Sequence, residues 1–105
     1  MDFFKNIIDK NQIENIPASK IDDLMDEGAF ILDVRTEGEY KERSVKNSVN
    51  IPLQELDVRY TELPDKKIYI LCRSGARSLE AAKFLKVKGF DVCNIKGGII
   101  EYPGK

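Results

Sequence analysis

The chain has 105 residues, 42% of them hydrophobic, with four tyrosines and five phenylalanines. This composition is typical of one folded domain with a single core rather than of a disordered chain. Seventeen basic residues against eighteen acidic residues give a net charge of −1, which argues against nucleic acid or an acidic membrane as the main partner. The sequence contains no histidine, which excludes Ser-His and Cys-His catalysis, and we expect neither a metal site nor a cofactor.

The N-terminal segment predicts a helix set apart from the rest of the chain. Apolar residues recur there at roughly helical spacing: Phe3, Phe4, Ile7 and Ile8. We therefore predict a leader helix over residues 1–13 and one domain over residues 14–105. The helix either covers an edge of the core or docks on a partner protein.

The same segment also helps to predict the cellular compartment of the protein. Charged and polar residues interrupt it, which is not the pattern of a signal peptide, and no run of about 18 apolar residues predicts a membrane span. The two cysteines, Cys72 and Cys93, are too few for a disulfide framework. We therefore expect a cytoplasmic protein, in which thiols stay reduced.

The first half of the domain alternates strands with helices. Residues 13–16 predict a short edge strand, and a helix follows that opens on a proline and a serine and ends at Gly28. The apolar run 29–35 predicts a central strand with Asp33 and Arg35 at its end. We expect these two side chains to pair or to cap neighbouring loops, and the alternative is that Arg35 adds positive potential to a site.

Two helical segments are predicted between this strand and the next. The charged segment 37–41 predicts one or two helical turns, and Pro52 starts a further helix that has Arg59 near its end. Arg59 either reaches a site at the sheet edge or, as we prefer, is a solvated surface charge. Residues 63–67 form a turn that leads into the next strand.

Cys72 occupies the position with the clearest chemical meaning. The continuously apolar run 68–71 predicts a buried strand, and residues 79–88 predict a helix. Cys72 therefore lies at the carboxyl end of a strand, in a short loop whose N–H groups and following helix favour a thiolate. Arg73 and Arg77 add positive charge near it. This polar, cationic setting favours a nucleophile over a buried structural cysteine.

The last strand completes an α/β pattern. Residues 90–95 predict this strand, and it contains Cys93, for which a buried structural role is favoured over that of a resolving thiol. Four apolar strands alternating with helices predict a small α/β domain with a mainly parallel sheet and helices on both faces.

The loop sequence Cys-Arg-Ser-Gly-x-Arg-Ser resembles the active-site loop of single-domain rhodanese-like sulfurtransferases. In that family the cysteine takes up a sulfane sulfur as a persulfide and passes it to an acceptor. By this resemblance Cys72 is the nucleophile, Gly75 permits the tight turn, and the persulfide or leaving anion is cradled by backbone N–H groups of Arg73, Ser74, Gly75, Ala76, Arg77 and Ser78.

Weaker pieces extend the resemblance over about residues 14–102. They are Asp-Val-Arg at 33–35, Asn-Ile-Pro-Leu at 50–53 and the Gly-Gly pair at 97–98. A Gly-His and a Gly-Ala that the family carries before Asn-Ile-Pro are absent, and Tyr102 stands where the family usually has tryptophan. Those positions are mainly architectural in the family.

The resemblance implies an enzyme that moves sulfur from thiosulfate or a low-molecular-weight persulfide to a thiol or cyanide. Double displacement through Cys72 predicts ping-pong kinetics. The alternative is a sulfur carrier or interaction module that uses the same loop with protein donors and acceptors. A phosphatase is disfavoured because cysteine phosphatases separate Cys and Arg by five residues, whereas four separate Cys72 from Arg77.

Overall fold

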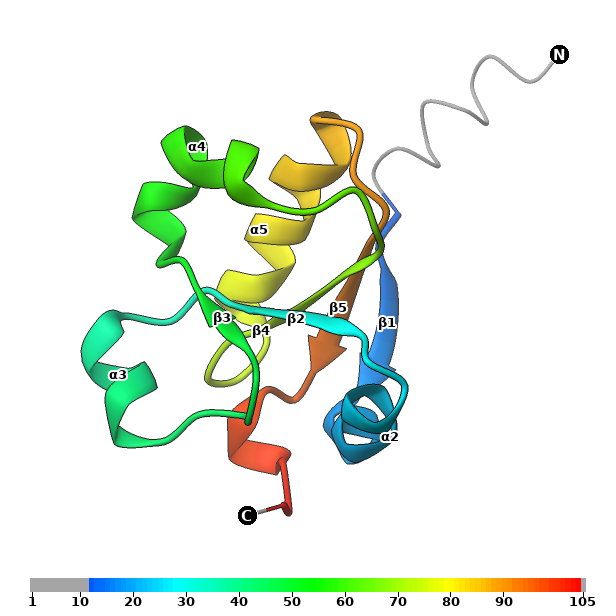
Figure 1. Cartoon of the computed structure of the whole chain (residues 1–105), viewed down its shortest axis with the longest axis vertical. Helices are drawn as coiled ribbons and strands as arrows, with labels where there is room; N and C mark the ends of the chain where they lie inside the picture. The colour runs from blue at the N-terminus through cyan, green and yellow to red at the C-terminus, as the bar shows by residue number, and fades with distance from the viewer. Residues whose placement is uncertain (1–11, 105) are drawn as a thin grey trace, which may run out of the picture.

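The computed structural model describes residues 12–104, which form one five-stranded sheet with four α-helices around it (Figure 1). All neighbouring strands are parallel, in the order β1-β5-β4-β2-β3. The strands are β1 (Glu14–Pro17), β2 (Phe30–Asp33), β3 (Val49–Asn50), β4 (Ile68–Leu71) and β5 (Val92–Lys96). The predicted α/β fold is confirmed, and β3 is a fifth strand that the sequence pattern did not reveal.

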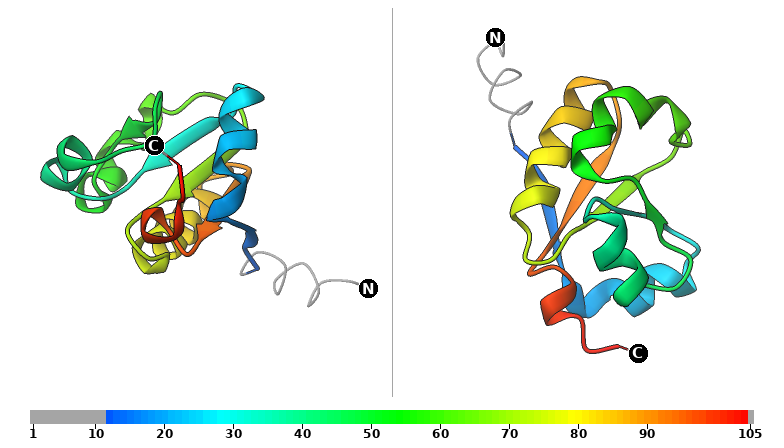
Figure 2. Two further views of the ribbon diagram at one scale, coloured as in Figure 1. Left: turned by 90° about the horizontal axis from the view of Figure 1, so that it is seen from below. Right: turned by 90° about the vertical axis from the view of Figure 1, so that its left-hand side faces the viewer.

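The helices cover both faces of the sheet, as predicted. They are α2 (Ile21–Asp26), α3 (Glu37–Glu42), α4 (Leu56–Arg59) and α5 (Ala76–Val87). Short 3₁₀ turns adjoin them or follow the last strand: Ala18–Lys20, Leu53–Glu55, Tyr60–Glu62 and Ile99–Glu101. Side chains of α4 and α5 share one core cluster and those of α2 share another. Figure 2 shows the arrangement of the helices around the sheet in two further views.

The central strand β4 divides its side chains between these two clusters. Ile68 and Ile70 face the cluster with α4 and α5, whereas Tyr69 and Leu71 face the cluster with α2. The alternation follows from the period of two in a strand. Cys72 continues the first set and therefore lies on the α5 side of the sheet.

Helix α5 begins three residues earlier than predicted. Gly75 is its N-cap residue and has a φ of 110°, a left-handed conformation that glycine adopts at low cost. The first turn of α5 therefore contains part of the segment that the sequence assigned to a loop, namely Ala76, Arg77 and Ser78. One face of α5 is buried, through Ser78, Ala81, Ala82 and Leu85.

The C-terminal turn is hydrogen-bonded to the backbone around Cys72. Ile99 donates its N–H to the Cys72 carbonyl at 2.9 Å, and Ile100 donates to the Arg73 carbonyl at 3.1 Å. A Cβ on Gly98 would lie 2.3 Å from the Arg73 carbonyl oxygen, a distance that no side chain tolerates. Only glycine at position 98 permits this close approach of the two backbones.

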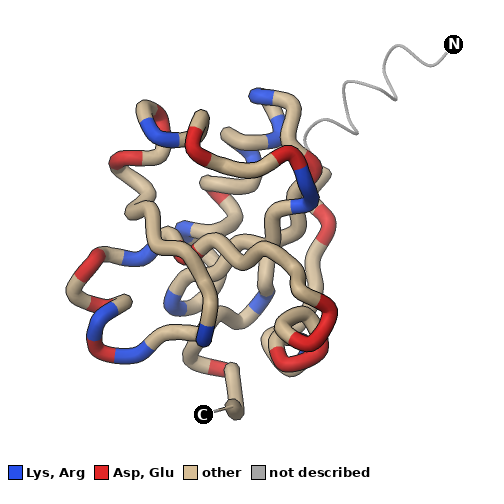
Figure 3. The backbone as a smooth tube through the Cα atoms, viewed as in Figure 1, with Lys and Arg blue, Asp and Glu red and all other residues tan. Residues whose placement is uncertain are grey.

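The predicted leader helix over residues 1–13 lies outside the described residues except for its last two, which have no regular secondary structure. That part of the domain assignment stays a prediction. Within residues 12–104, no helix combines the length and the apolar character needed to cross a membrane. Basic and acidic residues are interspersed along most of the described chain (Figure 3).

Candidate active site around Cys72

The carboxyl ends of β2 and β4 bring the predicted site residues to one edge of the sheet. Asp33 ends β2 and pairs in register with Leu71, the last residue of β4, so Asp33 and Cys72 follow neighbouring strands to the same edge. This is the edge at which parallel α/β sheets place their functional groups. Cys72 is 1% exposed, so its sulfur is enclosed by the turn that follows β4.

The Cys72 sulfur contacts two hydrogen-bonding groups of the turn that follows β4. The Gly75 N–H donates to it at 2.9 Å, and the Ser78 hydroxyl oxygen lies 3.4 Å away. Burial acts to raise the pKa of Cys72, but hydrogen bonds from the Ser78 side chain and from the N–H groups of Ser78, Gly75 and Ser74 outweigh it, so that the pKa lies below its ordinary value. The turn therefore stabilises a thiolate without any basic side chain bonded to the sulfur.

A buried polar chain that the sequence analysis missed continues from Ser78 into the sheet. The Ser78 hydroxyl lies within hydrogen-bond distance of the Asn94 side-chain oxygen and, at 3.1 Å, of the Gly75 carbonyl. Asn94, which is 4% exposed, donates to Asn15 on β1 at 2.8 Å. The signal in the sequence is an amide side chain in the middle of an otherwise apolar strand, where burial requires a partner.

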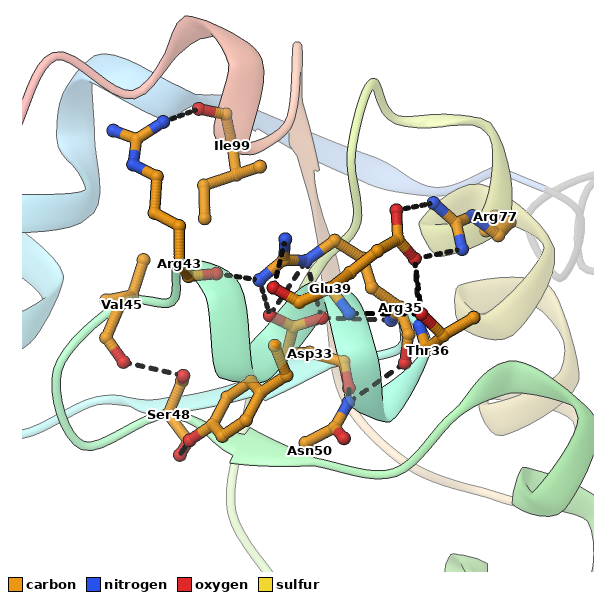
Figure 4. A network of polar contacts seen from close by, with 11 residues as sticks. Asp33, Arg35, Thr36, Glu39, Arg43, Val45, Ser48, Asn50, Arg77 and Ile99 are labelled. Atoms are coloured by element: carbon orange, nitrogen blue, oxygen red, sulfur yellow. Dashed lines mark hydrogen bonds and ion pairs between the residues drawn. The ribbon is translucent and has the colours of Figure 1, made fainter.

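The two arginines of the segment differ in their surroundings. Arg77 donates to both carboxylate oxygens of Glu39 on α3, at 2.9 and 3.0 Å (Figure 4). These hydrogen bonds from Arg77 are the main reason that the pKa of Glu39 is lowered to about 2. Arg73 is exposed, and its guanidinium makes no hydrogen bond or ion pair with any residue between 12 and 104.

Asp33 and Arg35 form a buried ion pair beside the site. The closest contact is 2.7 Å, and the two side chains are 0% and 4% exposed. Arg35 also donates to the carbonyl groups of Glu39 at 3.4 Å and Arg43 at 2.6 Å (Figure 4). The predicted pairing role is confirmed, and the pair fixes α3, which contributes no buried residue of its own.

Arg59 and Cys93 lie away from this arrangement. Arg59 is bonded to Glu55 and Glu62 on the surface of its own helical segment, so the preferred surface role fits the structure and we leave Arg59 out of the site. Cys93 is fully buried, and burial raises its pKa to about 11. Such a thiol is poorly suited to act as a resolving cysteine. Within residues 12–104, no cluster of carboxylates and thiolates is placed to hold a metal ion.

Comparison with known proteins decides the family. Residues 17–104 match the model of the rhodanese-like domain. The chain belongs to the rhodanese family. A sulfurtransferase of Allochromatium vinosum is 35% identical to this rhodanese domain over 78 residues, which cover 72% of the chain and 73% of the relative.

Two further relatives carry the rhodanese domain within longer proteins. The putative sulfur carrier protein YrkF of Bacillus subtilis is 43% identical over 82 residues, which cover 76% of this chain and 44% of YrkF. The crystal structure of reduced Bacillus anthracis CoADR-RHD superimposes with a TM-score of 0.83 and 40% identity, and the match covers 93% of this chain and 18% of that one. The family therefore includes proteins described as sulfurtransferases and as sulfur carriers.

Proposed function

We propose that this rhodanese domain transfers sulfane sulfur from a small persulfide or thiosulfate to a thiol through a persulfide on Cys72. The observation that carries the proposal is the set of donors around the Cys72 sulfur, with the Gly75 N–H at 2.9 Å and the Ser78 hydroxyl at 3.4 Å. These donors lower the pKa of Cys72 despite its burial. They would also face the negative charge of a persulfide sulfur attached to it.

The reaction has two displacements at sulfur. In the first, the Cys72 thiolate attacks the outer sulfur of the donor, the donor S–S bond breaks, and sulfite or a thiolate leaves with the bonding electron pair. In the second, an acceptor thiolate attacks the terminal sulfur of the Cys72 persulfide, and the Cys72 thiolate leaves. No net oxidation occurs, and no proton has to move at the reacting sulfur atoms.

The length of the turn supports a sulfur group over a phosphate ester as the ligand. Four residues separate Cys72 from Arg77, and Arg77 lies in the first turn of α5 with both terminal nitrogens bonded to Glu39. An arginine used in this way is not free to hold a tetrahedral phosphate bidentately.

A second candidate function is that of a sulfur carrier between proteins, favoured by the similarity to YrkF. The N-terminal residues Phe3, Phe4, Ile7 and Ile8, which lie outside the described structure, would then serve as the docking segment. Deleting residues 2–10 separates the two functions. Loss of protein-to-protein transfer with intact turnover of thiosulfate supports docking, and unchanged transfer argues against it.

Intact mass spectrometry tests the persulfide directly. The wild-type protein and Cys72→Ser are compared before and after brief exposure to thiosulfate or a small persulfide. We expect one added sulfur atom only where Cys72 is present, and its removal by cyanide. A wild-type protein that gains no sulfur from either small donor would exclude the enzyme and would put the carrier or interaction module, which uses protein donors, in first place.

A further inference from the structure

The charge near the proposed nucleophile is lower than the loop sequence suggests. Arg77 is held in two hydrogen bonds by Glu39, which comes from α3 and lies 38 positions away in the sequence. Because the pKa of Glu39 is lowered to about 2, this carboxylate stays ionised at every pH at which the protein would work. The positive charge of Arg77 is thus matched by a permanent negative charge.

Glu39 is fixed in this position by contacts that do not involve Arg77. One of its carboxylate oxygens accepts the Thr36 N–H at 2.9 Å and lies 3.1 Å from the Thr36 hydroxyl, which completes a capping box at the start of α3. The Glu39 carbonyl is bonded to Arg35 of the buried ion pair. An incoming anion therefore cannot displace Glu39 from Arg77 without disturbing the anchored start of α3.

The ion pair of Arg77 with Glu39 joins two separate helices, whereas the surface pairs of Arg59 join residues of one helical segment. The pair of Arg59 with Glu55 joins two residues one turn apart, with side chains 36% and 47% exposed. The pair of Arg77 with Glu39 joins α5 to α3, with side chains 36% and 29% exposed. The second pair bridges two elements at the site, which is why its charge balance matters for the ligand.

The balance of charges disfavours a dianion. Arg73 is left as the cation of the turn without an ionic partner among residues 12–104, and the thiolate of Cys72 offsets one positive charge. Thiosulfate carries two negative charges, whereas the persulfide of a small neutral thiol carries one. A donor with a single charge therefore enters this site at lower electrostatic cost than thiosulfate does.

We infer that Glu39 is a specificity-determining residue, which neutralises Arg77 and so directs the site toward singly charged persulfide donors and away from dianionic thiosulfate. The inference rests on the proposed function, because it concerns the donor for the Cys72 persulfide. Glu39 touches Arg77 rather than the reacting atoms. It acts through the charge that Arg77 presents to the donor.

The test compares Glu39→Gln with the wild-type protein for two donors, thiosulfate and 2-hydroxyethyl persulfide. Glutamine keeps the oxygen that caps α3 and removes the charge. We expect kcat/KM for thiosulfate to rise about tenfold, while the value for the singly charged persulfide changes less than about threefold. Glu55→Gln is the matched control, because it removes the same charge from an exposed pair with Arg59 and should leave both values unchanged.

The ratio of the two kcat/KM values decides the inference. The inference is overturned if Glu39→Gln changes this ratio no more than Glu55→Gln does, which includes the case in which Glu39→Gln changes both kcat/KM values by the same factor. If wild-type Cys72 gains no sulfur from either donor, the proposed function itself fails. If it gains sulfur and only the ratio is unaffected, the function stands and the role of Glu39 is refuted.

A measurement on the wild-type protein keeps the test valid if Glu39→Gln does not fold. If Glu39 neutralises Arg77, the site has little net positive charge to attract the dianion. The value of kcat/KM for thiosulfate should then change little between about 20 mM and about 500 mM NaCl. A steep fall with salt would show that a net positive site attracts the dianion, and would overturn the inference.

Discussion

Replacing Ser78 by alanine should raise the pKa of Cys72 and slow its reaction with electrophiles. The Ser78 oxygen lies 3.4 Å from the sulfur, and a hydrogen bond to an ionised group contributes about 1.5–3 kcal/mol. Because the contact is long, we take the lower end of this range, and about 1.4 kcal/mol corresponds to a factor of ten. Below the pKa, the thiolate fraction should therefore fall about tenfold.

The assay is the rate of alkylation of Cys72 by iodoacetamide as a function of pH. Cys93 contributes little to this rate, because burial raises its pKa to about 11, whereas the pKa of Cys72 is lowered. Ser74→Ala is the matched control, since it removes a hydroxyl from the same turn but keeps the Ser74 N–H that helps to lower the pKa of Cys72. The control should react like the wild-type protein.

Two results would refute this reasoning about Ser78. One is an unchanged pH profile in Ser78→Ala, and the other is equal slowing in Ser74→Ala. The single proton of the Ser78 hydroxyl is donated to the Asn94 oxygen while Cys72 is a neutral thiol, and it can turn to the sulfur when Cys72 ionises. The substitution therefore also leaves the buried Asn94 oxygen without this donor in the thiol form, which should cost about 1–3 kcal/mol of stability. Circular dichroism and urea unfolding of Ser78→Ala therefore accompany the alkylation assay.

Three further predictions concern stability. Gly98→Ala should lower the free energy of unfolding by about 2 kcal/mol or more, because its Cβ would lie 2.3 Å from the Arg73 carbonyl oxygen. Urea unfolding measures this loss. Gly28→Ala is the control, because Gly28 also has a positive φ but its Cβ would have nothing within 4 Å. Leu85→Asp should unfold the domain, since Leu85 is fully buried, and wild-type melting would contradict the packing of α5. The pKa of Glu39 is lowered from 4.5 to about 2, so Glu39 stabilises the fold above about pH 4.5 and loses this effect as the pH falls toward 2; denaturation at several pH values should show the wild-type advantage over Glu39→Gln vanishing in acid.

Local sequence patterns predicted the parts of the fold that neighbouring residues determine. The apolar runs of β2 and β4 were confirmed as strands because each depends on a few adjacent positions. The predicted start of α5 was three residues too late, because the sequence indicated that Gly75 is a loop residue but not that it is the N-cap of the helix. Strand β3 was missed because two residues, Val49 and Asn50, carry no periodic pattern, and only pairing with β2 defines them.

The polar partners of the site could not be predicted in the same way. Glu39 and Arg77 are 38 positions apart, and Ser78 and Asn94 are 16 apart. A hydrogen-bonded pair has no sequence period, so its members are identified only once the sheet order brings their strands and helices together. The charge pattern of the loop alone therefore overstated how much positive charge the site presents.

The site needs no histidine, and the proposed chemistry explains why. Each displacement begins with a thiolate and ends with an anion that is a good leaving group, so no general acid or base is required. What the reaction does require is a sulfur that stays ionised although it is buried, and hydrogen-bond donors can provide that while adding no net charge. The N–H of Gly75 and the hydroxyl of Ser78 supply these hydrogen bonds. The choice of the sulfur-donor molecule then depends on the charges around the turn, where the negative charge of Glu39 opposes the positive charge of Arg77.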